Sequence, residues 1–235
     1  MNQIKRAIIV AAGEGSRLRP VTLTTPKPLV KVNGVRIIDT IIDALKANGI
    51  HEIYIVSGYK KEQFFEIYND DPDITVIENP RYLNTNNVTS LYLVREHLQD
   101  AFIIEGDLLI HNPEIFNPFF EKSAYLATYM ESTPEWALTL NDGTICSYSV
   151  SGGKNSHRLW GVSMWTREDG EKLSELLRKQ VEEIGELGIY WDELALPDPK
   201  IKFNLGIREI SLSDILEIDT FEELKAVDSS YNGYH

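Results

Sequence analysis

A segment near the N-terminus places glycines and basic side chains at a spacing suited to a polyphosphate. Gly13 and Gly15 come shortly after residues 7–10, an apolar run typical of a buried strand. Glycines in this position let the backbone pass close to a bulky anion with its N–H groups turned inward. Arg17 and Lys27 add positive charge to the same turn. The segment therefore predicts a site that holds a triphosphate.

Two other phosphate-binding motifs do not fit this segment. A dinucleotide-binding fingerprint needs a third glycine where Leu18 stands. A P-loop needs Gly-Lys followed by Ser or Thr, and the segment has no such sequence. These two classes of nucleotide site are therefore not expected here.

Two aspartates are candidate ligands for a metal ion. Asp107 lies shortly after the apolar run 101–105, where a carboxylate can face phosphates and hold a hard cation such as Mg²⁺. It could equally be an ordinary turn residue. Asp219 has the same two interpretations, because Thr220 and Glu223 have the spacing of a helix capping box that Asp219 would complement. Spacing alone does not decide between metal ligand and helix cap.

The segment 151–158 is polar and basic, and we expect it to be a flexible loop. Lys154 in this loop is suited to meet a second substrate that carries a phosphate. A solvated surface loop would have the same composition, so this interpretation also stays open. His157 could act as a general base, but nothing in the sequence positions it for that role.

Aromatic and acidic residues are adjacent at two places in the second half of the chain. Glu135 precedes Trp136, and Tyr190, Trp191 and Asp192 are consecutive. Rings beside carboxylates attract a quaternary ammonium group through cation–π and Coulomb forces. Any one of these rings could instead fill the core. The three consecutive residues are harder to explain in that way, because they place a charge beside two large rings.

The elements that must position these residues alternate between strand and helix in the first half. The hydrophobic spacing predicts strands over 7–10, 53–56, 74–77 and 101–105, with helices over 37–45, 62–68 and 90–98. Such alternation indicates parallel strands with crossover helices, hence an open three-layer α/β sheet. Ligands bind beyond the carboxyl ends of the strands in these sheets, where the glycine turn and Asp107 would both lie.

The second half changes character. Its spacing predicts strands over 125–130, 136–140, 144–150 and 160–165, and a helix over 168–184. Antiparallel strands would extend the parallel sheet into a mixed one. We therefore expect a Rossmann-like α/β fold with a mixed, mostly parallel central sheet and an antiparallel extension. Residues 1–235 would form a single domain, with a nucleotide-binding half to about 110 and an acceptor-binding half from about 111.

The composition restricts the classes of partner. The 235 residues carry a formal net charge of −13, whereas proteins that bind nucleic acid usually present a basic face. The single cysteine, Cys146, cannot form an internal disulfide, which suits a reducing compartment. No apolar run approaches the ~18 residues of a membrane span. We therefore expect a cytoplasmic protein that acts on small molecules, without nucleic acid or membrane, and of undetermined oligomeric state.

The motifs together resemble a known enzyme family. The pattern Ala-Ala-Gly-x-Gly-x-Arg-Leu-x-Pro, followed by Pro-Lys-Pro, spans residues 11–28 and looks like the signature of nucleotidyltransferases that activate phosphorylated small molecules. Further segments resemble bacterial choline-phosphate cytidylyltransferases: residues 86–94, 135–136, 161–165, 190–192 and 217–219. The resemblance covers nearly the whole chain, strongly before Asp107 and more patchily after it.

The resemblance implies a role for each matching residue. The implied catalytic residues bring positive charge to the phosphates: Arg17, Lys27 and Lys154. The implied nucleotide contacts are Ala12, Gly13, Gly15, Arg17, Lys27, Asn87 and Ser90. The implied ligands of Mg²⁺ are Asp107 and Asp219, and the implied amine-binding residues are Trp136, Tyr190, Asp192 and Glu217.

The resemblance also implies a reaction, the transfer of CMP from CTP to phosphocholine with release of pyrophosphate. The loop 152–158 departs from the choline-phosphate enzymes, and a sister group that activates 2-aminoethylphosphonate shares most of the motifs. A cytidylyltransferase for 2-aminoethylphosphonate or phosphoethanolamine is therefore the alternative. A sugar-1-phosphate nucleotidyltransferase or a silent nucleotide sensor is less expected, since a sensor need not keep both metal acids.

Overall fold

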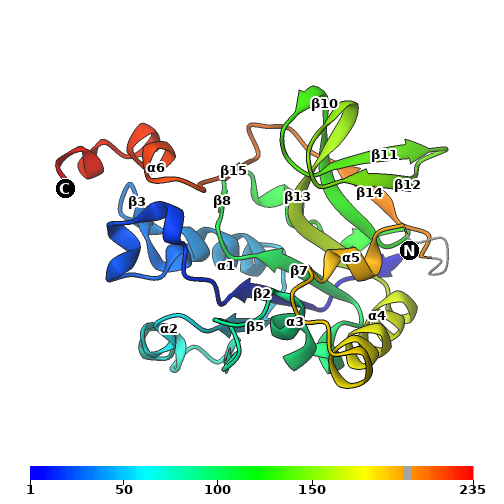
Figure 1. The fold of residues 1–235 in the computed structure, drawn as a ribbon, viewed down its shortest axis with the longest axis horizontal. Helices are drawn as coiled ribbons and strands as arrows, with labels where there is room; N and C mark the ends of the chain where they lie inside the picture. Colours follow the sequence, from blue (N-terminus) through cyan, green and yellow to red (C-terminus); the bar gives the residue numbers. More distant parts are fainter. Residues whose placement is uncertain (198–202, 235) are drawn as a thin grey trace.

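The computed structural model describes residues 1–197 and 203–234 (Figure 1). The strands are β1 (Asn2–Gln3), β2 (Arg6–Ala11), β3 (Lys31–Val32), β4 (Val35–Arg36), β5 (Glu52–Ser57), β6 (Ile74–Glu78), β7 (Ala101–Glu105), β8 (Leu108–Ile110), β9 (Phe119–Phe120), β10 (Ala124–Thr133), β11 (Ala137–Asn141), β12 (Thr144–Ser149), β13 (Gly153–Trp165), β14 (Gly206–Glu209) and β15 (Ile215–Glu217). The α-helices are α1 (Ile37–Ala47), α2 (Lys61–Tyr68), α3 (Val88–Leu93), α4 (Arg167–Lys179), α5 (Asp192–Ala195) and α6 (Phe221–Val227).

The central sheet is mixed. In the described part of the chain it runs in the order β12-β11-β13-β7-β2-β5-β6, with β10 beside β13 and β14 beside β10. The four strands from β7 to β6 are mutually parallel, whereas β13 is antiparallel to β7. The long strand β13 pairs with β7 near its end and with the β11–β12 hairpin near its start. It thereby joins the parallel sheet to the antiparallel extension, and the predicted fold class is confirmed.

Alternating side chains place helices on both faces of the parallel strands. In β2, Ala7 and Ile9 join the core beneath α1 and α2, whereas Ile8 and Val10 join the core beneath α3 and α4. Successive side chains of a strand point to opposite faces, so a strand that is apolar throughout, such as β2, can be buried on both faces. A smaller core packs α6 against residues 18–37, which brings the C-terminal segment over the glycine-rich turn.

Three predicted elements need correction. The polar segment 151–158 is not a loop over most of its length, because β13 begins at Gly153 and its neighbours β10 and β11 supply the backbone partners. The helix predicted over 90–98 ends at Leu93 and is followed by a 3₁₀ turn over Arg95–His97. The helix predicted over 168–184 ends at Lys179 and continues as a π-helical turn.

In the residues that the structure describes, no helix is long and apolar enough to cross a membrane.

Candidate active site

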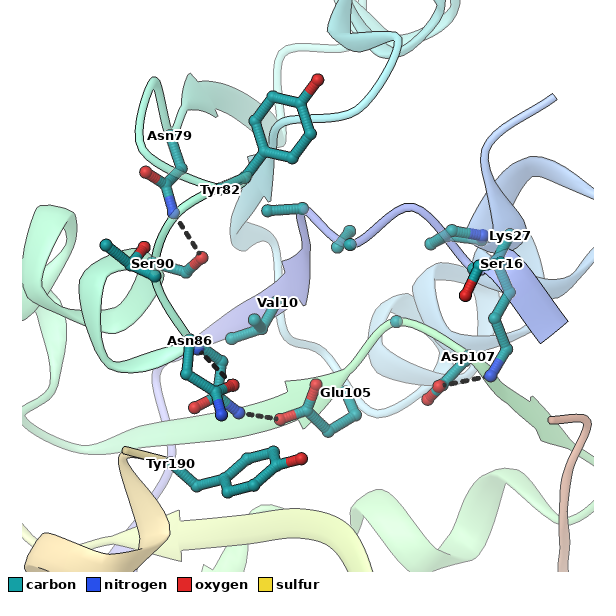
Figure 2. A pocket seen from close by; sticks show the side chains of 18 of the residues that line it. Val10, Ser16, Lys27, Asn79, Tyr82, Asn86, Ser90, Glu105, Asp107 and Tyr190 are labelled. Carbon is teal, nitrogen blue, oxygen red and sulfur yellow. Dashed lines mark hydrogen bonds and ion pairs between the residues drawn. The ribbon is translucent and has the colours of Figure 1, made fainter. Parts of the chain in front are cut away.

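A cavity of about 350 Å³ lies at the carboxyl ends of β2 and β7 (Figure 2). One side is formed by the glycine-rich turn, including Ala12 and Gly13, and the opposite side by residues 85–90 and Tyr190. Lys27 and Asp107 lie at one end of the cavity. The sheet edge therefore brings together the predicted triphosphate turn, a metal acid and one of the predicted aromatic residues, as open α/β sheets do.

The backbone of the turn depends on Gly15. Its φ of +59° is in the left-handed region, and a Cβ there would lie 2.7 Å from Cβ of Lys27. The carbonyl of Gly15 accepts a hydrogen bond from Oγ1 of Thr22 at 2.9 Å. This close approach fixes the turn against the segment that carries Lys27. By contrast, nothing lies within 4 Å of a Cβ built on Gly13, so the backbone there faces open space.

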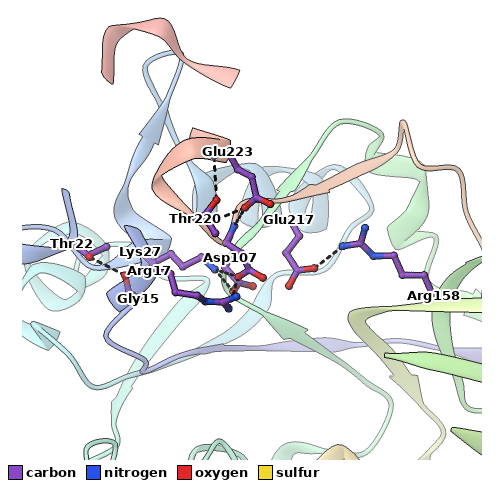
Figure 3. A network of polar contacts seen from close by, with 10 residues as sticks. Gly15, Arg17, Thr22, Lys27, Asp107, Arg158, Glu217, Thr220 and Glu223 are labelled. Atoms are coloured by element: carbon purple, nitrogen blue, oxygen red, sulfur yellow. Dashed lines mark hydrogen bonds and ion pairs between the residues drawn. The ribbon is translucent and has the colours of Figure 1, made fainter. Parts of the chain in front are cut away.

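Lys27 is held between the two predicted metal acids (Figure 3). Its Nζ lies 2.7 Å from Oδ2 of Asp107 and 2.7 Å from Oδ1 of Asp219, and the residue is only 7% exposed. Burial would lower the pKa of Lys27, but the charges and hydrogen bonds of both aspartates outweigh it and raise the pKa. Burial would likewise raise the pKa of Asp219, but the Lys27 ammonium and the nearby Arg17 lower it. Lys27 and Asp219 are therefore both charged at neutral pH.

A third carboxylate, Glu217, belongs to the same group of acids. One oxygen each from Asp107, Glu217 and Asp219 lie within 4.8 Å of one another. Nη2 of Arg158 donates to Oε2 of Glu217 at 2.8 Å. Burial, with the charges of the two aspartates, raises the pKa of Glu217 to about 7. Glu217, predicted at the amine end, thus lies beside the predicted metal ligands.

The donor set of this acid group fits a Mg²⁺ ion. Oδ1 of Asp107 is buried and has no hydrogen-bond partner among the described residues. An oxygen of this kind is costly to bury unless a ligand satisfies it. Mg²⁺ prefers carboxylate oxygens and retains waters and phosphate ligands. The capping box of Thr220 and Glu223 is present, which confirms the helix-cap interpretation of this segment, whereas the role of Asp219 as a metal ligand stays a prediction.

Asn87 and Ser90 form part of the cavity wall that we predicted to hold the cytidine. Nδ2 of Asn87 donates to Oε1 of Glu105 at 3.0 Å, and its Oδ1 accepts from the backbone N–H of Trp191 at 2.9 Å. The buried hydroxyl of Ser90 accepts from Nδ2 of Asn79 at 2.9 Å. Both side chains are therefore fixed by the protein, and their contact with the base stays a prediction.

The predicted aromatic residues gather beside the cavity. Tyr190 lines it and is 45% exposed. Trp136 meets Tyr190 edge to face, with ring centroids 5.3 Å apart, and stacks on Tyr148 at 5.9 Å. Trp136 is not among the residues that line the cavity, so Tyr190 is the one predicted amine-binding ring that does. Trp191 is buried against Tyr125, which is the core-packing role considered for it.

Asp192 follows Trp191 and begins the short helix α5. Its Oδ1 accepts a hydrogen bond from the Tyr125 hydroxyl at 3.0 Å. Burial is the main influence on this carboxyl and raises its pKa to about 7, although the Tyr125 hydrogen bond opposes the change. The carboxylate therefore titrates near neutral pH.

Lys154 and His157 lie on β13, away from the acids. Lys154 is exposed and pairs across the sheet with Ser132, outside the residues that line the cavity. His157 contacts the ring of Tyr129 at 5.6 Å. The expected role of Lys154 toward an incoming phosphate stays a prediction, and none of the described residues forms an ion pair with His157 that would make it a base.

Glu105, which was not predicted as a site residue, lines the cavity at the end of β7. Burial and the charges of Asp107 and Asp192 raise its pKa. A Cβ on Gly161 would lie 2.6 Å from Cγ of Glu105, so the neighbouring strand makes room for this side chain. The signal was available, because Glu105 is an acid that ends an otherwise apolar run at the carboxyl edge of the sheet.

The family model for nucleotidyl transferases matches residues 6–134, which include the glycine-rich turn, Lys27 and Asp107. The chain belongs to the nucleotidyl transferase family. The family resemblance predicted from residues 11–28 is therefore confirmed. The match ends before the segments that carry Tyr190 and Asp219, so it describes the nucleotide side of the site.

Relatives of this nucleotidyl transferase extend the match to the whole chain. The chain is 34% identical to the 2-aminoethylphosphonate cytidylyltransferase of Lancefieldella rimae over 96% of this chain and 92% of that protein. It is 33% identical to the choline-phosphate cytidylyltransferase of Streptococcus pneumoniae, over 95% and 96%. The solved structure of the CTP:phosphocholine cytidylyltransferase from Streptococcus pneumoniae matches with a TM-score of 0.87 at 34% identity, covering 97% of this chain and 99% of that one.

Proposed function

We propose that this nucleotidyl transferase transfers CMP from CTP to phosphocholine, giving CDP-choline and pyrophosphate. The observation that carries the proposal is the single cavity in which the triphosphate turn and the open ring of Tyr190 face each other. Whole-chain similarity to a choline-phosphate cytidylyltransferase and to the solved CTP:phosphocholine enzyme supports the same substrates. In this proposal the triphosphate of CTP lies along the turn and the acceptor lies beside Tyr190.

In this reaction the protein must mainly neutralise negative charge, and it needs no nucleophile of its own. A phosphate oxygen of phosphocholine forms a bond to the α-phosphorus of CTP, and the bond from that phosphorus to the bridging oxygen of pyrophosphate breaks. The attacking oxygen is already anionic, so no strong general base is needed. Arg17 and Lys27 would reduce the repulsion between two anions and stabilise the crowded transition state. Asp107 and Asp219 would hold Mg²⁺, which when bound supplies further charge at the phosphates.

The amine end favours a quaternary ammonium group. A primary ammonium needs several free hydrogen-bond acceptors, whereas a trimethylammonium group needs ring faces. The carboxylates near Tyr190 already have protein partners: Asp192 has Tyr125, and Glu105 has Asn87. The Tyr190 ring, in contrast, is open to the cavity. This distribution supports phosphocholine.

2-Aminoethylphosphonate is the second candidate acceptor. The 34% identity to a 2-aminoethylphosphonate cytidylyltransferase is at least as high as that to the choline-phosphate enzymes. Each paired carboxylate also keeps a second oxygen that could accept from a primary ammonium.

Pyrophosphate release from CTP with a panel of acceptors tests the proposal. The panel contains phosphocholine, phosphoethanolamine, 2-aminoethylphosphonate and a sugar 1-phosphate, each with and without Mg²⁺, and mass spectrometry identifies the product. We expect the highest kcat/KM with phosphocholine and no turnover after chelation of the metal. A preference for 2-aminoethylphosphonate would show that this compound, and not phosphocholine, is the acceptor. Product from sugar 1-phosphates alone would refute the proposed function. Asp107→Asn is the inactive control.

A further inference from the structure

Three acids lie close together beyond the Lys27 end of the cavity, and three cations form ion pairs with them (Figure 3). Lys27 contacts Asp107 and Asp219, and Nη2 of Arg17 lies 3.0 Å from the same Asp219 oxygen that Lys27 binds. The third acid pairs with the third cation at 2.8 Å, Glu217 with Arg158. The formal charges of these six groups cancel without any metal ion. The acid group is therefore neutralised by the protein itself.

The ammonium of Lys27 occupies the space between the two aspartates that would hold a metal ion. Its ammonium is within hydrogen-bond distance of one oxygen from each, and little of the side chain is exposed. A divalent ion placed between Asp107 and Asp219 would be close to this ammonium, which repels it through a poorly hydrated region. Arg17 adds to this repulsion more weakly, because its side chain is 67% exposed.

A bound nucleotide would draw Arg17 and Lys27 away from the aspartates. Arg17 and Lys27 both line the cavity together with the glycine-rich turn. A triphosphate bound along that turn would offer anionic oxygens that replace the aspartates as their partners. The aspartates would then be free for a cation, and the unpartnered Oδ1 of Asp107 would be satisfied.

We propose that Lys27 acts as the resident counter-ion of the metal site and makes metal binding conditional on nucleotide binding. In the nucleotide-free protein the ammonium blocks the aspartates. With CTP bound, it moves to a phosphate oxygen and the metal takes its place. Nucleotide and metal therefore increase each other's affinity by the same factor, as linkage requires. This inference rests on the proposed function only for the identity of the nucleotide.

The chain contains a matched control for this behaviour. Lys46 bridges Asp71 and Asp73 at 2.8 and 3.1 Å, in a cluster that includes His51 and does not line the cavity. Removing Lys46 also leaves two aspartates without their ammonium partner. It does so without a neighbouring triphosphate turn or an orphaned buried oxygen. Comparing the two lysines separates the proposed metal site from the general effect of unpairing acidic residues.

The test measures Mn²⁺ binding to nucleotide-free protein by electron paramagnetic resonance. We expect weak binding to the wild type and at least about tenfold tighter binding to Lys27→Met, with no gain for Lys46→Met. Lys27→Gln, which keeps hydrogen bonds to the aspartates but not the charge, serves if the methionine variant does not fold, and should also bind more tightly. Unchanged Mn²⁺ affinity in the folded Lys27 variants, or an equal gain in Lys46→Met, would overturn the inference.

A second titration adds CTP, with free Mn²⁺ corrected for the amount that the nucleotide itself binds. We expect CTP to tighten Mn²⁺ binding to the wild type by at least about tenfold and to have a smaller effect on Lys27→Met. An equal effect on both proteins would contradict the exchange. No acceptor is present, so failure of the proposed acceptor leaves this result intact. Conversely, if the enzyme forms CDP-choline but wild type and Lys27→Met bind Mn²⁺ equally well, this inference is refuted and the proposed function stands.

Discussion

The side-chain amide of Asn87 joins the two halves of the site, because its Nδ2 lies 3.0 Å from Oε1 of Glu105. Glu105 ends a strand of the parallel sheet, whereas the other end of the same amide holds the backbone N–H of Trp191. The preceding residue, Asn86, adds backbone and side-chain hydrogen bonds to Leu187 and Gly188. The segment that presents Tyr190 is thus attached to the wall of the nucleotide cavity.

Asn87→Ala should therefore weaken binding of the acceptor more than binding of the nucleotide. The substitution leaves the Trp191 N–H without its partner, at a cost of about 1–3 kcal/mol, and releases Tyr190 from its position. We expect the KM for phosphocholine to rise about tenfold or more, with a smaller change in the KM for CTP, measured by varying each substrate. Asn69→Ala, at an exposed position outside the cavity, is the control. A change confined to the KM for CTP would instead indicate direct contact between Asn87 and the base.

Lys27→Ala tests the charge at the α-phosphate. Losing one preorganised cation of this kind should lower kcat by on the order of 10²–10³. The measurement is steady-state pyrophosphate release at saturating CTP. Lys46→Ala removes a lysine that also bridges two aspartates but lies outside the cavity, and should leave kcat unchanged. Near-normal turnover of the Lys27 variant would refute its catalytic role.

The fold could be predicted largely because hydrophobic spacing reports burial. The parallel strands are apolar on both faces, and their pattern matched the observed β2, β5, β6 and β7 within a few residues. The start of β13 could not be recognised in the same way, because residues 154–158 are polar and basic. These residues form a strand through backbone pairing with β10 and β11. Such tertiary pairing leaves little trace in local composition.

The site was predictable in its parts and not in their arrangement. Asp107 followed from the rule that ligands bind at the carboxyl edge of a parallel sheet. The contact of Lys27 with both Asp107 and Asp219 joins residues 80 and 192 positions apart, and no local pattern reports it. For the same reason the sequence placed Glu217 only at the amine end, whereas the structure places it beside the two aspartates.

Asp192 should make stability depend on pH. Its pKa in the folded protein is about 7, above the ordinary 3.8, so the folded state holds the proton more tightly than the unfolded state. The contribution of Asp192 to the free energy of unfolding should thus fall as pH rises from about 4 to about 7 and level off above it. Asp192→Asn cannot ionise but keeps an acceptor for Tyr125, so it should gain on the wild type by on the order of 2 kcal/mol between pH 4.5 and 8. Urea unfolding at both pH values measures this; a constant difference would contradict it.

Gly15→Ala should damage both stability and catalysis. The left-handed backbone costs a residue with a Cβ about 1–2 kcal/mol, and that Cβ would lie 2.7 Å from Cβ of Lys27. Gly34 is the matched control, because its φ is +89° but nothing lies within 4 Å of the added atom. Gly34→Ala should therefore lose stability alone, whereas Gly15→Ala should also lower kcat by at least about tenfold as Lys27 is pushed from the aspartates. Urea unfolding and pyrophosphate release on both variants separate the two effects. Equal losses of activity would show that the contact between the turn and Lys27 does not matter for catalysis.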